Sequence, residues 1–351
     1  MIIPDIIIED GLSIVQQRGC GQYTMRLYEI LKSIDGINVE LKRKPFLENI
    51  KNSAIRRLLY ILWLNTFFLL SLLFKNKPKV CIFSSVVTPM IKIPNTKYIS
   101  ILHDIRSVLY PELSTKIQNL HSDFANWTAV KFSDKLVTVS ETSKNDIIKN
   151  YKINPDKITV IYNTSSVAEI QINMEDDFLS RYKLEMGKYL LFVGGLDKNK
   201  NIQLIIDSFN LISEKYPDLK LVIVGNKGNS DIKIGKNTIL TGFISNEEIK
   251  CLYKNAAAYL FPSIYEGFGI PILDAQIIGC PVICSDIPVF REIGRDSVIY
   301  SILDKDIFSQ KIDNLLTNAQ EKDSLIRLGY ENVKRFSKEV IKEQLLQCIK
   351  E

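Results

Sequence analysis

The chain has 351 residues, of which 46% are hydrophobic and 24% are charged. This length exceeds one ordinary core and suits two domains, and the composition excludes a disordered or fibrous protein. The net charge of +5 is uneven, because residues 1–160 hold 22 basic and 14 acidic side chains, a balance of +8, which leaves −3 for residues 161–351.

The basic first half indicates an acidic partner, either anionic lipid headgroups or a phosphate-bearing acceptor. We expect no nucleic-acid partner, because no Lys/Arg stripe interleaved with aromatic residues is present. The six cysteines form no CxxC pair, and Cys81, Cys280 and Cys284 fall in or beside predicted buried strands. They are typical of core residues in a reducing compartment. The N-terminal MIIPDIIIEDG lacks a secretory leader, so we expect a cytoplasmic protein.

The first elements are a buried strand over Ile6–Glu9, a loop over Asp10–Gln22 and a helix over Tyr23–Ser33. The loop contains Gly19 and Gly21, which permit backbone conformations that other residues avoid. Taken singly, each glycine fits an ordinary turn between strand and helix.

The most apolar stretch is the helix predicted over Leu58–Phe74, which has three polar interruptions. Its 17 residues fall short of the roughly 20 that span a bilayer. On a helical wheel Leu, Ile and Phe cover nearly every side except the one shared by Arg56, Arg57, Tyr60 and Lys75. We favour a core helix packed on a sheet. The alternatives are a helix whose outer face also dips into a membrane, for which the flanking basic residues are suited, and a true span.

Two strands follow, over Val80–Phe83 and Tyr98–His103. His103 and Asp104 therefore come at the carboxyl end of a strand, the edge where open α/β sheets bind ligands. A histidine that terminates a strand for structural reasons is the alternative. The other histidine, His121, lies in a predicted helix without ligand partners nearby.

Strands over Lys135–Val139 and Ile158–Ile161, with a helix from Ser140 to about Asn150 between them, complete a Rossmann-like half. Residues 163–182 lose periodicity and are the predicted linker.

The second half opens with a strand over Tyr189–Val193, followed by GGLDKNKN, which contains Gly195 and Lys200, and by a helix over Ile202–Lys215. A strand over Leu219–Val224 comes next, and a strand over Thr238–Thr241 precedes Phe243 and Ile244. Taken by itself, Lys200 is an ordinary solvated lysine of a loop.

The most informative stretch runs from Tyr259 to Glu292 and predicts strand, loop, helix, strand and loop. A strand over Ala257–Phe261 leads to the turn Glu266-Gly267-Phe268-Gly269, and Pro271 begins a helix that ends at Gly279. Bare amides of residues 267–270 at a helix start favour an anion such as a diphosphate.

Two carboxylates border this turn, Glu266 before it and Asp274 about one helical turn after it. Carboxylates there would accept hydrogen bonds from sugar hydroxyls, so the pattern fits a nucleotide-sugar. A solvated glutamate and an aspartate that favours the helix dipole are the alternative.

The stretch YLFPSIYEGFGIPILDAQIIGCPVICSD resembles the signature of the retaining glycosyltransferases of family four, of the kind that includes bacterial mannosyl- and rhamnosyltransferases of surface polysaccharide synthesis. Three features depart from the family pattern. The second acid is Asp274 in place of glutamate, and Thr164 stands where the family usually has a glycine. The phosphate-loop arginine is absent, since its candidate positions hold Gly195 and Asn199.

The resemblance implies an α/β protein of the GT-B type, with two Rossmann-like domains facing across a cleft. We expect an acceptor domain over 1–162, the linker over 163–182, a nucleotide-sugar domain over 183–335, and a helix over 336–351 that returns to the first domain.

The resemblance also assigns residues to roles. His103, Asp104 and Glu266 would be catalytic. Gly19, Gly21 and Tyr23 would lie on the acceptor side. The donor would contact Gly195, Lys200, Phe243, Ile244, Glu266, Gly267, Phe268, Gly269, Ile270 and Asp274.

The implied reaction is retaining hexosyl transfer from a nucleoside diphosphate sugar to a polyprenyl-diphosphate-linked saccharide, without a cofactor or catalytic metal, at the inner membrane face. The alternatives are a nucleotide-sugar 2-epimerase and a catalytically silent glycan-binding or partner subunit.

Overall fold

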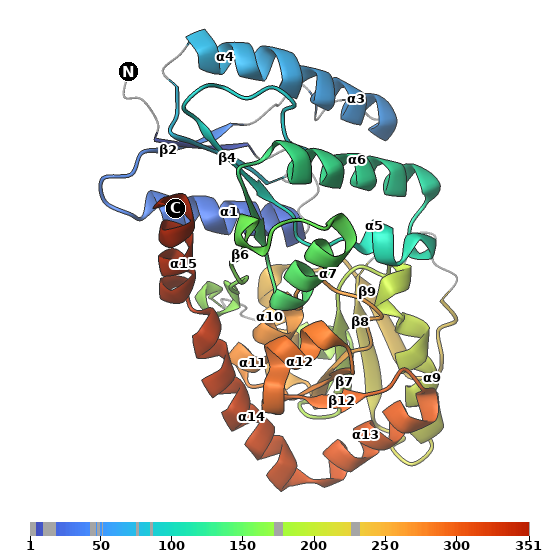
Figure 1. Cartoon of the computed structure of the whole chain (residues 1–351). Helices are drawn as coiled ribbons and strands as arrows, with labels where there is room; N and C mark the ends of the chain where they lie inside the picture. Colours follow the sequence, from blue (N-terminus) through green and yellow to red (C-terminus); the bar gives the residue numbers. More distant parts are fainter. Residues whose placement is uncertain are drawn as a thin grey trace. The chain divides into compact units, whose positions relative to one another are not determined.

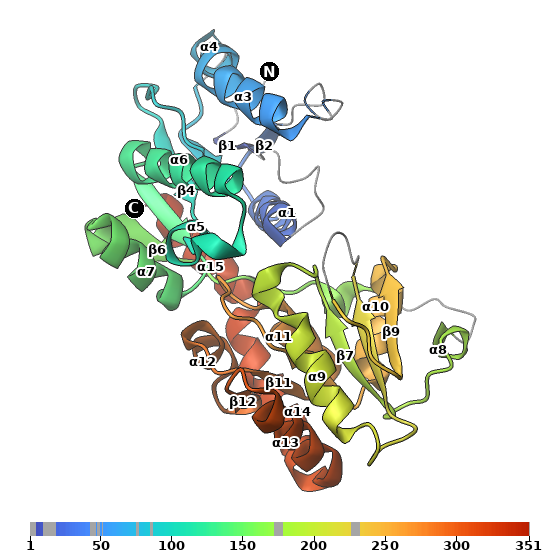
Figure 2. The ribbon, with the colours of Figure 1, turned by 90° about the vertical axis from the view of Figure 1, so that its right-hand side faces the viewer.

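The computed structural model describes residues 5–9, 19–42, 47, 50, 52–74, 77–84, 87–171, 178–225 and 232–350. The chain divides into two compact units (Figures 1 and 2). The first unit comprises Met1–Asn163 and Lys338–Glu351, and the second comprises Thr164–Ser337.

The first unit is built on a six-stranded parallel sheet with the order β2-β1-β3-β4-β5-β6. Its strands are β1 (Ile6–Glu9), β2 (Val39–Lys42), β3 (Val80–Phe83), β4 (Lys97–Ile101), β5 (Lys135–Thr138) and β6 (Ile158–Val160). The strand order reverses between β1 and β3, so the ligand edge expected for this sheet lies at their carboxyl ends.

Helices connect these strands and cover the sheet. They are α1 (Gly19–Lys32), α3 (Ser53–Trp63), the π-helical turn η2 (Leu64–Phe68), α4 (Leu69–Phe74), α5 (Arg106–Leu109), η3 (Pro111–Leu113), α6 (Lys116–Phe132), α7 (Glu141–Tyr151), η4 (Pro155–Lys157) and α15 (Lys338–Lys350). The last helix joins the first unit, where Lys97 Nζ donates to the carbonyl of Cys348 at 2.8 Å.

One hydrophobic core lies between the sheet and the helix formed by α3, η2 and α4. Tyr60, Leu64 and Phe68, spaced four residues apart, are buried there with Phe83 and Tyr98 of the strands. Phe68 meets Phe83 edge-on, with ring centroids 6.2 Å apart. Because Ala125 and Phe124 of α6 pack on the same cluster, this helix and α6 lie on one face of the sheet, as Figure 1 shows.

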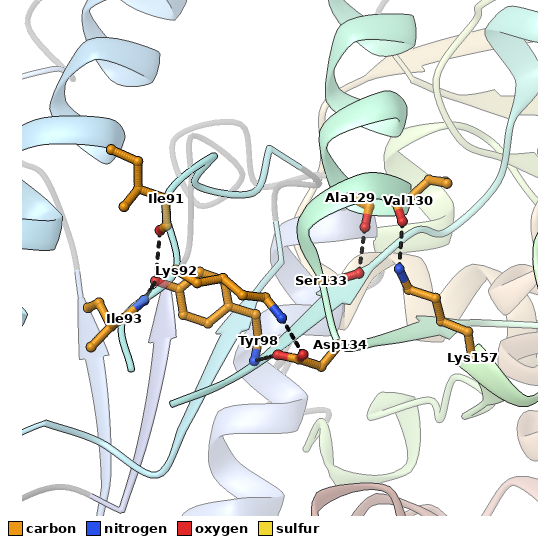
Figure 3. A network of polar contacts seen from close by, with 9 residues as sticks. All are labelled: Ile91, Lys92, Ile93, Tyr98, Ala129, Val130, Ser133, Asp134 and Lys157. Atoms are coloured by element: carbon orange, nitrogen blue, oxygen red, sulfur yellow. Dashed lines mark hydrogen bonds and ion pairs between the residues drawn. The ribbon is translucent and has the colours of Figure 1, made fainter. Parts of the chain in front are cut away.

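The amino ends of β4 and β5 are held by a polar network (Figure 3). The Asp134 carboxylate accepts the backbone N–H of Tyr98 at 2.8 Å and pairs with Lys92. Burial alone would raise the pKa of Asp134, but these hydrogen bonds and the charges of Lys92 and Lys157 outweigh it and lower the pKa. The network lies at the end of the sheet opposite the ligand edge, so its role is structural.

The second unit also contains a six-stranded parallel sheet, with the order β12-β11-β10-β7-β8-β9. The strands are β7 (Tyr189–Val193), β8 (Lys220–Val224), β9 (Thr238–Gly242), β10 (Ala258–Phe261), β11 (Val282–Ser285) and β12 (Ile299–Ser301). This is the Rossmann strand order, and the order reverses between β7 and β10.

The helices of the second unit flank this sheet. They are η5 (Val167–Glu169), α8 (Phe178–Arg181), η6 (Lys198–Lys200), α9 (Ile202–Ile212), α10 (Asn246–Asn255), α11 (Ile270–Ile278), α12 (Pro288–Gly294), η7 (Arg295–Ser297), α13 (Lys305–Thr317), α14 (Ala319–Val333) and η8 (Lys334–Phe336).

Several sequence predictions of local structure were wrong. Gly19 and Gly21 are the first and third residues of α1 and not part of a loop, because the buried stripe of Tyr23, Leu27 and Leu31 supports a helix that tolerates glycine in its first turn. Residues 288–294 form α12, where a loop was expected, and Pro288 suits the start of a helix. The short strands β2 and β12 had no strong sequence signal.

Tyr60 also differs from expectation, since the helical wheel placed it on the polar side. It is 1% exposed, and its hydroxyl donates to the Glu9 carboxylate at 2.7 Å. A carboxylate partner allows a tyrosine to be buried in an apolar face.

The predicted linker starts at Asn163, the last residue of the first unit before the chain enters the second, and its other described residues belong to the second unit. Lys250 of α10 donates to the carbonyls of Ala168 and Ile170 at 3.2 and 2.6 Å, so this part of the segment is fastened to α10. Residues 172–177 of the predicted linker lie outside the described residues.

Candidate functional site

The candidate donor site lies in the second unit at the carboxyl ends of β7 and β10. These are the strands between which the order of the sheet reverses, and a crevice for ligands forms at such a point. Tyr259 of β10 donates to the carbonyl of Val193, the last residue of β7, at 3.3 Å. Burial raises the pKa of Tyr259 well above its usual value, so this hydroxyl stays a neutral donor.

Glu266 and Lys200 form an ion pair at this edge. Lys200 Nζ lies 2.5 Å from Glu266 Oε1, and both side chains are largely buried, at 18% and 15% exposure. Ser263 Oγ donates to the same carboxylate oxygen at 2.7 Å, and the ammonium lies 5.2 Å from the centre of the Phe261 ring. A lysine in this setting is a fixed charge and not the solvated surface residue that the loop by itself predicts.

Asn199 joins the two loops that carry this pair. Its carbonyl accepts the N–H of Ile264 at 2.8 Å, and its side-chain amide donates to the carbonyl of Tyr265 at 3.3 Å. The residue is 3% exposed, so it has no space for the arginine that the resemblance suggests. Asn199 instead fixes the distance between Lys200 and Glu266. Sequence reasoning missed this role, because only the fold shows which loop faces it.

The start of α11 supplies backbone donors beside the pair. Gly269 is the N-cap, with φ of 117°, and no side chain caps the helix. A Cβ at this glycine would lie 3.0 Å from Phe290 Cε1, so both the conformation and the space require glycine. The helix starts one residue earlier than expected, at Ile270, and Pro271 is its second residue. Uncapped amides at a helix start, next to a lysine, suit an anion.

The side chain of Phe268 does not serve this site. It is 4% exposed and meets Phe336 edge-on, with ring centroids 5.5 Å apart. Gly267 is buried as well, so the predicted donor contacts of both residues would have to come from their backbone.

Asp274 lies on the second turn of α11 and has a side-chain partner. Ser165 Oγ hydrogen-bonds to Asp274 Oδ1, and the backbone N–H of Val167 donates to Ser165 Oγ at 3.1 Å. The carboxylate is partly exposed. Ser165 was not expected to take part in the site, because it belongs to the stretch predicted as linker.

The loops at β7, β8 and β9 bring backbone close together at this edge. A Cβ at Gly225 would lie 2.2 Å from the Gly194 carbonyl, and a Cβ at Gly195 would lie 2.9 Å from Asp197 Oδ2. Phe243, after β9, is 85% exposed, and Ile244 is partly exposed. An exposed aromatic ring at a ligand edge could stack on a flat group such as a base.

In the first unit two predicted residues come together. The Tyr23 ring of α1 meets the His103 ring edge-on, with centroids 4.9 Å apart, although 80 residues separate them in sequence. Tyr23 is buried and its hydroxyl donates to the carbonyl of Ile161 at 3.5 Å. His103 follows β4 and is partly exposed. Asp104 accepts the N–H of Arg106 at 2.9 Å and so shapes the start of α5.

The first sheet holds one buried acid that the sequence did not mark. Glu9 ends β1 and is fully buried, where it receives the Tyr60 hydroxyl, and its carbonyl accepts Ser84 Oγ at 2.9 Å. It lies at the point where the strand order reverses, between β1 and β3. In the sequence, Glu9 is the acidic last residue of an apolar run, and this position is the one signal that could have identified it as a buried acid.

Comparison with known proteins agrees with this geometry. Residues 174–332 match the model described as glycosyl transferases group 1, and residues 41–165 match that described as glycosyltransferase family 4. Over 262 residues the chain is 33% identical to the O-antigen chain mannosyltransferase RfbU of Salmonella typhimurium, covering 71% of this chain and 68% of that protein. The chain belongs to glycosyltransferase family 4.

Other relatives of this glycosyltransferase have related names. It is 25% identical to the O-antigen chain mannosyltransferase B of Escherichia coli, over 72% of this chain and 70% of that protein. It is 26% identical to a Campylobacter jejuni 4-alpha-N-acetylgalactosaminyltransferase whose name specifies a diphospho-undecaprenol saccharide, over 75% of this chain and 66% of that protein. The activity is therefore glycosyl transfer in surface-polysaccharide synthesis, and the relatives give no support to the silent-subunit or epimerase alternatives.

Solved structures support the fold of the glycosyltransferase. The sucrose-phosphate synthase of Thermosynechococcus elongatus matches with a TM-score of 0.76 at 18% identity, over 99% of this chain and 98% of that one. WaaG, a glycosyltransferase involved in lipopolysaccharide biosynthesis, matches with a TM-score of 0.71 at 14% identity, over 98% and 99%. The expected two-domain α/β GT-B fold is confirmed.

Proposed function

We propose that this glycosyltransferase transfers a hexosyl unit from a nucleoside diphosphate sugar with retention at the anomeric carbon and without a catalytic metal. The observation that supports the proposal best is the Lys200–Glu266 pair beside the uncapped start of α11. It provides a cation and amides for a diphosphate, and a carboxylate for sugar hydroxyls, on adjoining loops.

The lysine and the amides have the same task in the reaction. The bond from the anomeric carbon to the diphosphate oxygen breaks, and negative charge grows on the leaving diphosphate. Lys200 and the amides at residues 267–270 stabilise that charge from loops that Asn199 already holds together. With this cation in place, the leaving group does not require a metal.

Glu266 changes partner when the donor binds. Without ligand its Oε1 is held by Lys200 and Ser263. With donor, Lys200 turns toward the diphosphate and the carboxylate accepts hydroxyls of the hexose. Asp274, with Ser165 behind it, accepts hydroxyls of the ribose. Phe243 and Ile244 border the base.

The acceptor hydroxyl forms the new bond on the face that the diphosphate leaves, and its proton passes to the leaving phosphate oxygen. We assign His103 to orienting the reacting groups, with the Tyr23 ring fixing the imidazole. The products are the glycosylated acceptor and a nucleoside diphosphate.

For the acceptor we propose a saccharide linked to a polyprenyl diphosphate, on the cytoplasmic face of the membrane. The relative from Campylobacter jejuni supports this, since its name specifies such a lipid, and the basic first half of this chain suits a phosphate-bearing acceptor.

The experiment has two stages. Thermal unfolding against a panel of UDP-, GDP- and dTDP-sugars finds the donor, which raises the melting point of the parent protein and raises it much less in Glu266→Ala and Lys200→Ala. Transfer to a lipid-linked acceptor is then followed with and without EDTA, and NMR gives the anomeric configuration of donor and product.

We expect the same configuration in both and a rate unchanged by EDTA. An inverted product would contradict retention, and a loss of rate that Mg²⁺ restores would contradict metal independence. Donor binding without turnover on any lipid acceptor would favour the silent subunit. Release of a changed free sugar would favour the epimerase.

A further inference from the structure

The helix made of α3, η2 and α4 has apolar side chains on two opposite sides. Its inner stripe is buried against the sheet and contains Tyr60, Leu64, Phe68 and Leu72. Its outer stripe is exposed, up to 69% at Phe67, and contains Ile55, Leu58, Leu59, Leu62, Phe67, Leu70 and Leu73. Helices on a protein surface normally turn polar side chains to water, so this outer stripe indicates a surface that something covers.

The polar side chains within this helix bond to its own backbone. Asn65 Nδ2 donates to the carbonyl of Ile61 at 3.0 Å, Thr66 Oγ1 to that of Leu62 at 2.6 Å, and Ser71 Oγ to that of Phe68 at 2.7 Å. Such bonds satisfy side-chain donors without water, as they do in helices that contact lipid. The stretch from Leu58 to Leu73 contains no charged residue.

The exposed apolar surface extends beyond this helix. Asn65 Oδ1 accepts the N–H of Met90 at 2.8 Å, which brings the exposed Met90 and Ile91 alongside. On α6, which shares the same core, Leu120 and Trp127 are exposed seven residues apart. We call these residues, with the outer stripe, the outer apolar face.

Basic side chains border the outer apolar face. Lys77 follows the helix and is exposed, and the exposed Lys79 after it is paired with Asp5 at 2.8 Å. Arg57 lies in the second turn of the helix, and Lys131 Nζ lies 5.0 Å from the centre of the Trp127 ring. Cations around an apolar surface that contains tryptophan match the headgroup region of an anionic bilayer. This excess of basic side chains favours an anionic lipid surface over an uncharged apolar partner.

We propose that the outer apolar face lies in the interfacial region of an anionic lipid bilayer and holds the enzyme there without crossing it. The segment Ile55–Leu73 is long and apolar enough to span a membrane by length and composition. Its inner stripe, however, forms the core of the first sheet, so spanning would require that core to open. Only the outer stripe can meet lipid. The proposal identifies the lipid-contacting surface of the proposed function, and binding to lipid requires no donor.

Tryptophan fluorescence can report contact with lipid, because the two tryptophans of the chain, Trp63 and Trp127, both belong to elements of this face. The purified full chain is mixed with vesicles of phosphatidylcholine alone or with added phosphatidylglycerol. We expect tryptophan emission to shift to the blue with the anionic vesicles, and to be quenched by lipids brominated near the headgroup. Added salt should weaken binding.

Variants localise the contact. Leu62→Glu with Phe67→Glu changes two exposed positions of the outer stripe and should weaken vesicle binding by about tenfold or more. The matched control, Leu211→Glu with Ile302→Glu, changes two exposed apolar residues of the second unit and should leave binding unchanged. Both double variants should keep the parent melting point and its shift with donor, which shows that they fold.

Other results would overturn the proposal. Equal loss in both double variants would show that added charge alone, and not this face, decides binding. Absence of any vesicle binding, with the donor shift intact, would refute the membrane surface and leave the proposed function standing. Concentration-dependent dimerisation that Leu62→Glu with Phe67→Glu abolishes, without quenching by brominated lipid, would identify a second copy as the occupant.

Discussion

The two units share a sheet plan but differ in where they expose apolar surface. Each has six parallel strands and one reversal of strand order. Among the described residues, thirteen of twenty exposed large apolar side chains belong to the first unit, and seven of these lie on α3, η2 and α4.

The ligand edges differ as well. In the second unit an ion pair and a helix start without a side-chain cap lie on loops held by Asn199. In the first unit, Glu9 lies at the point where the strand order reverses. It is fully buried and accepts a hydrogen bond from Tyr60 of the helix made of α3, η2 and α4. The same sheet plan thus carries two different edges: a buried ion pair beside a helix start in the second unit, and a buried acid tied to an apolar helix in the first. The following predictions test this contrast.

The largest effect is expected at the ion pair of the second unit. Glu266→Gln and Lys200→Met should each lower the transfer rate by about 10² to 10³-fold, because each removes a charge that is aligned before the reaction. Initial rates with the donor found in the panel measure this. Glu214→Gln, an exposed acid of the same unit, is the control and should keep the parent rate. A tenfold loss or less in both pair variants would mean that the pair only supports the loops.

In the first unit we expect the largest effect at the buried acid. Tyr60→Phe removes the hydroxyl that Glu9 receives, and loss of a buried hydrogen bond to a charged group should cost about 2 to 3 kcal/mol of unfolding free energy. Denaturant unfolding of the full chain, followed by the emission of Trp63 and Trp127, measures it. Tyr60→Phe with Glu9→Gln should recover part of the loss. A single variant as stable as the parent would show that Glu9 does not depend on this bond.

A smaller effect is expected at the helix start of the second unit. Gly269→Ala adds backbone strain and a contact 3.0 Å from Phe290, and should cost about 1 to 2 kcal/mol in stability and weaken donor binding. Gly187→Ala separates the two causes, since Gly187 has a φ of 74° but open space around it. Gly187→Ala should lose only the stability that backbone strain costs, and its donor binding should be unchanged. Equal losses of stability and donor binding in Gly269→Ala and Gly187→Ala would show that the contact with Phe290 has no role.

The smallest effect concerns pH. Burial, and then the charge of Arg57, lowers the pKa of His121 to about 4. The unfolded chain therefore takes up the proton first, near pH 6.5, so stability should be full above that pH and fall as the pH drops toward 4. Because the side chain is only partly buried, we expect about 1 kcal/mol across this window. His121→Gln should flatten the melting-point profile between pH 6.5 and 4, and an unchanged slope would assign the effect elsewhere.

The sequence determined the strands and the donor loop, because these depend on local patterns. Apolar runs predicted β1, β3, β7 and β10 to within one residue. The helix over Ile270–Ile278 was predicted from its proline and from Gly279, which ends it with φ of 81°. A run with a weak apolar pattern, such as β2, was not predicted, since its pairing with β1 decides it.

Only the tertiary structure decided which residues meet. Lys200 and Glu266 are 66 residues apart, and Ser165 and Asp274 are 109 apart, so no local pattern relates them. The same holds for the two sides of the Leu58–Phe74 helix. Its composition is apolar all round, and the sheet alone determines that Tyr60 turns inward while Phe67 stays exposed. Side-chain spacing fixes a helix, but the surface against which it packs fixes the face that it buries.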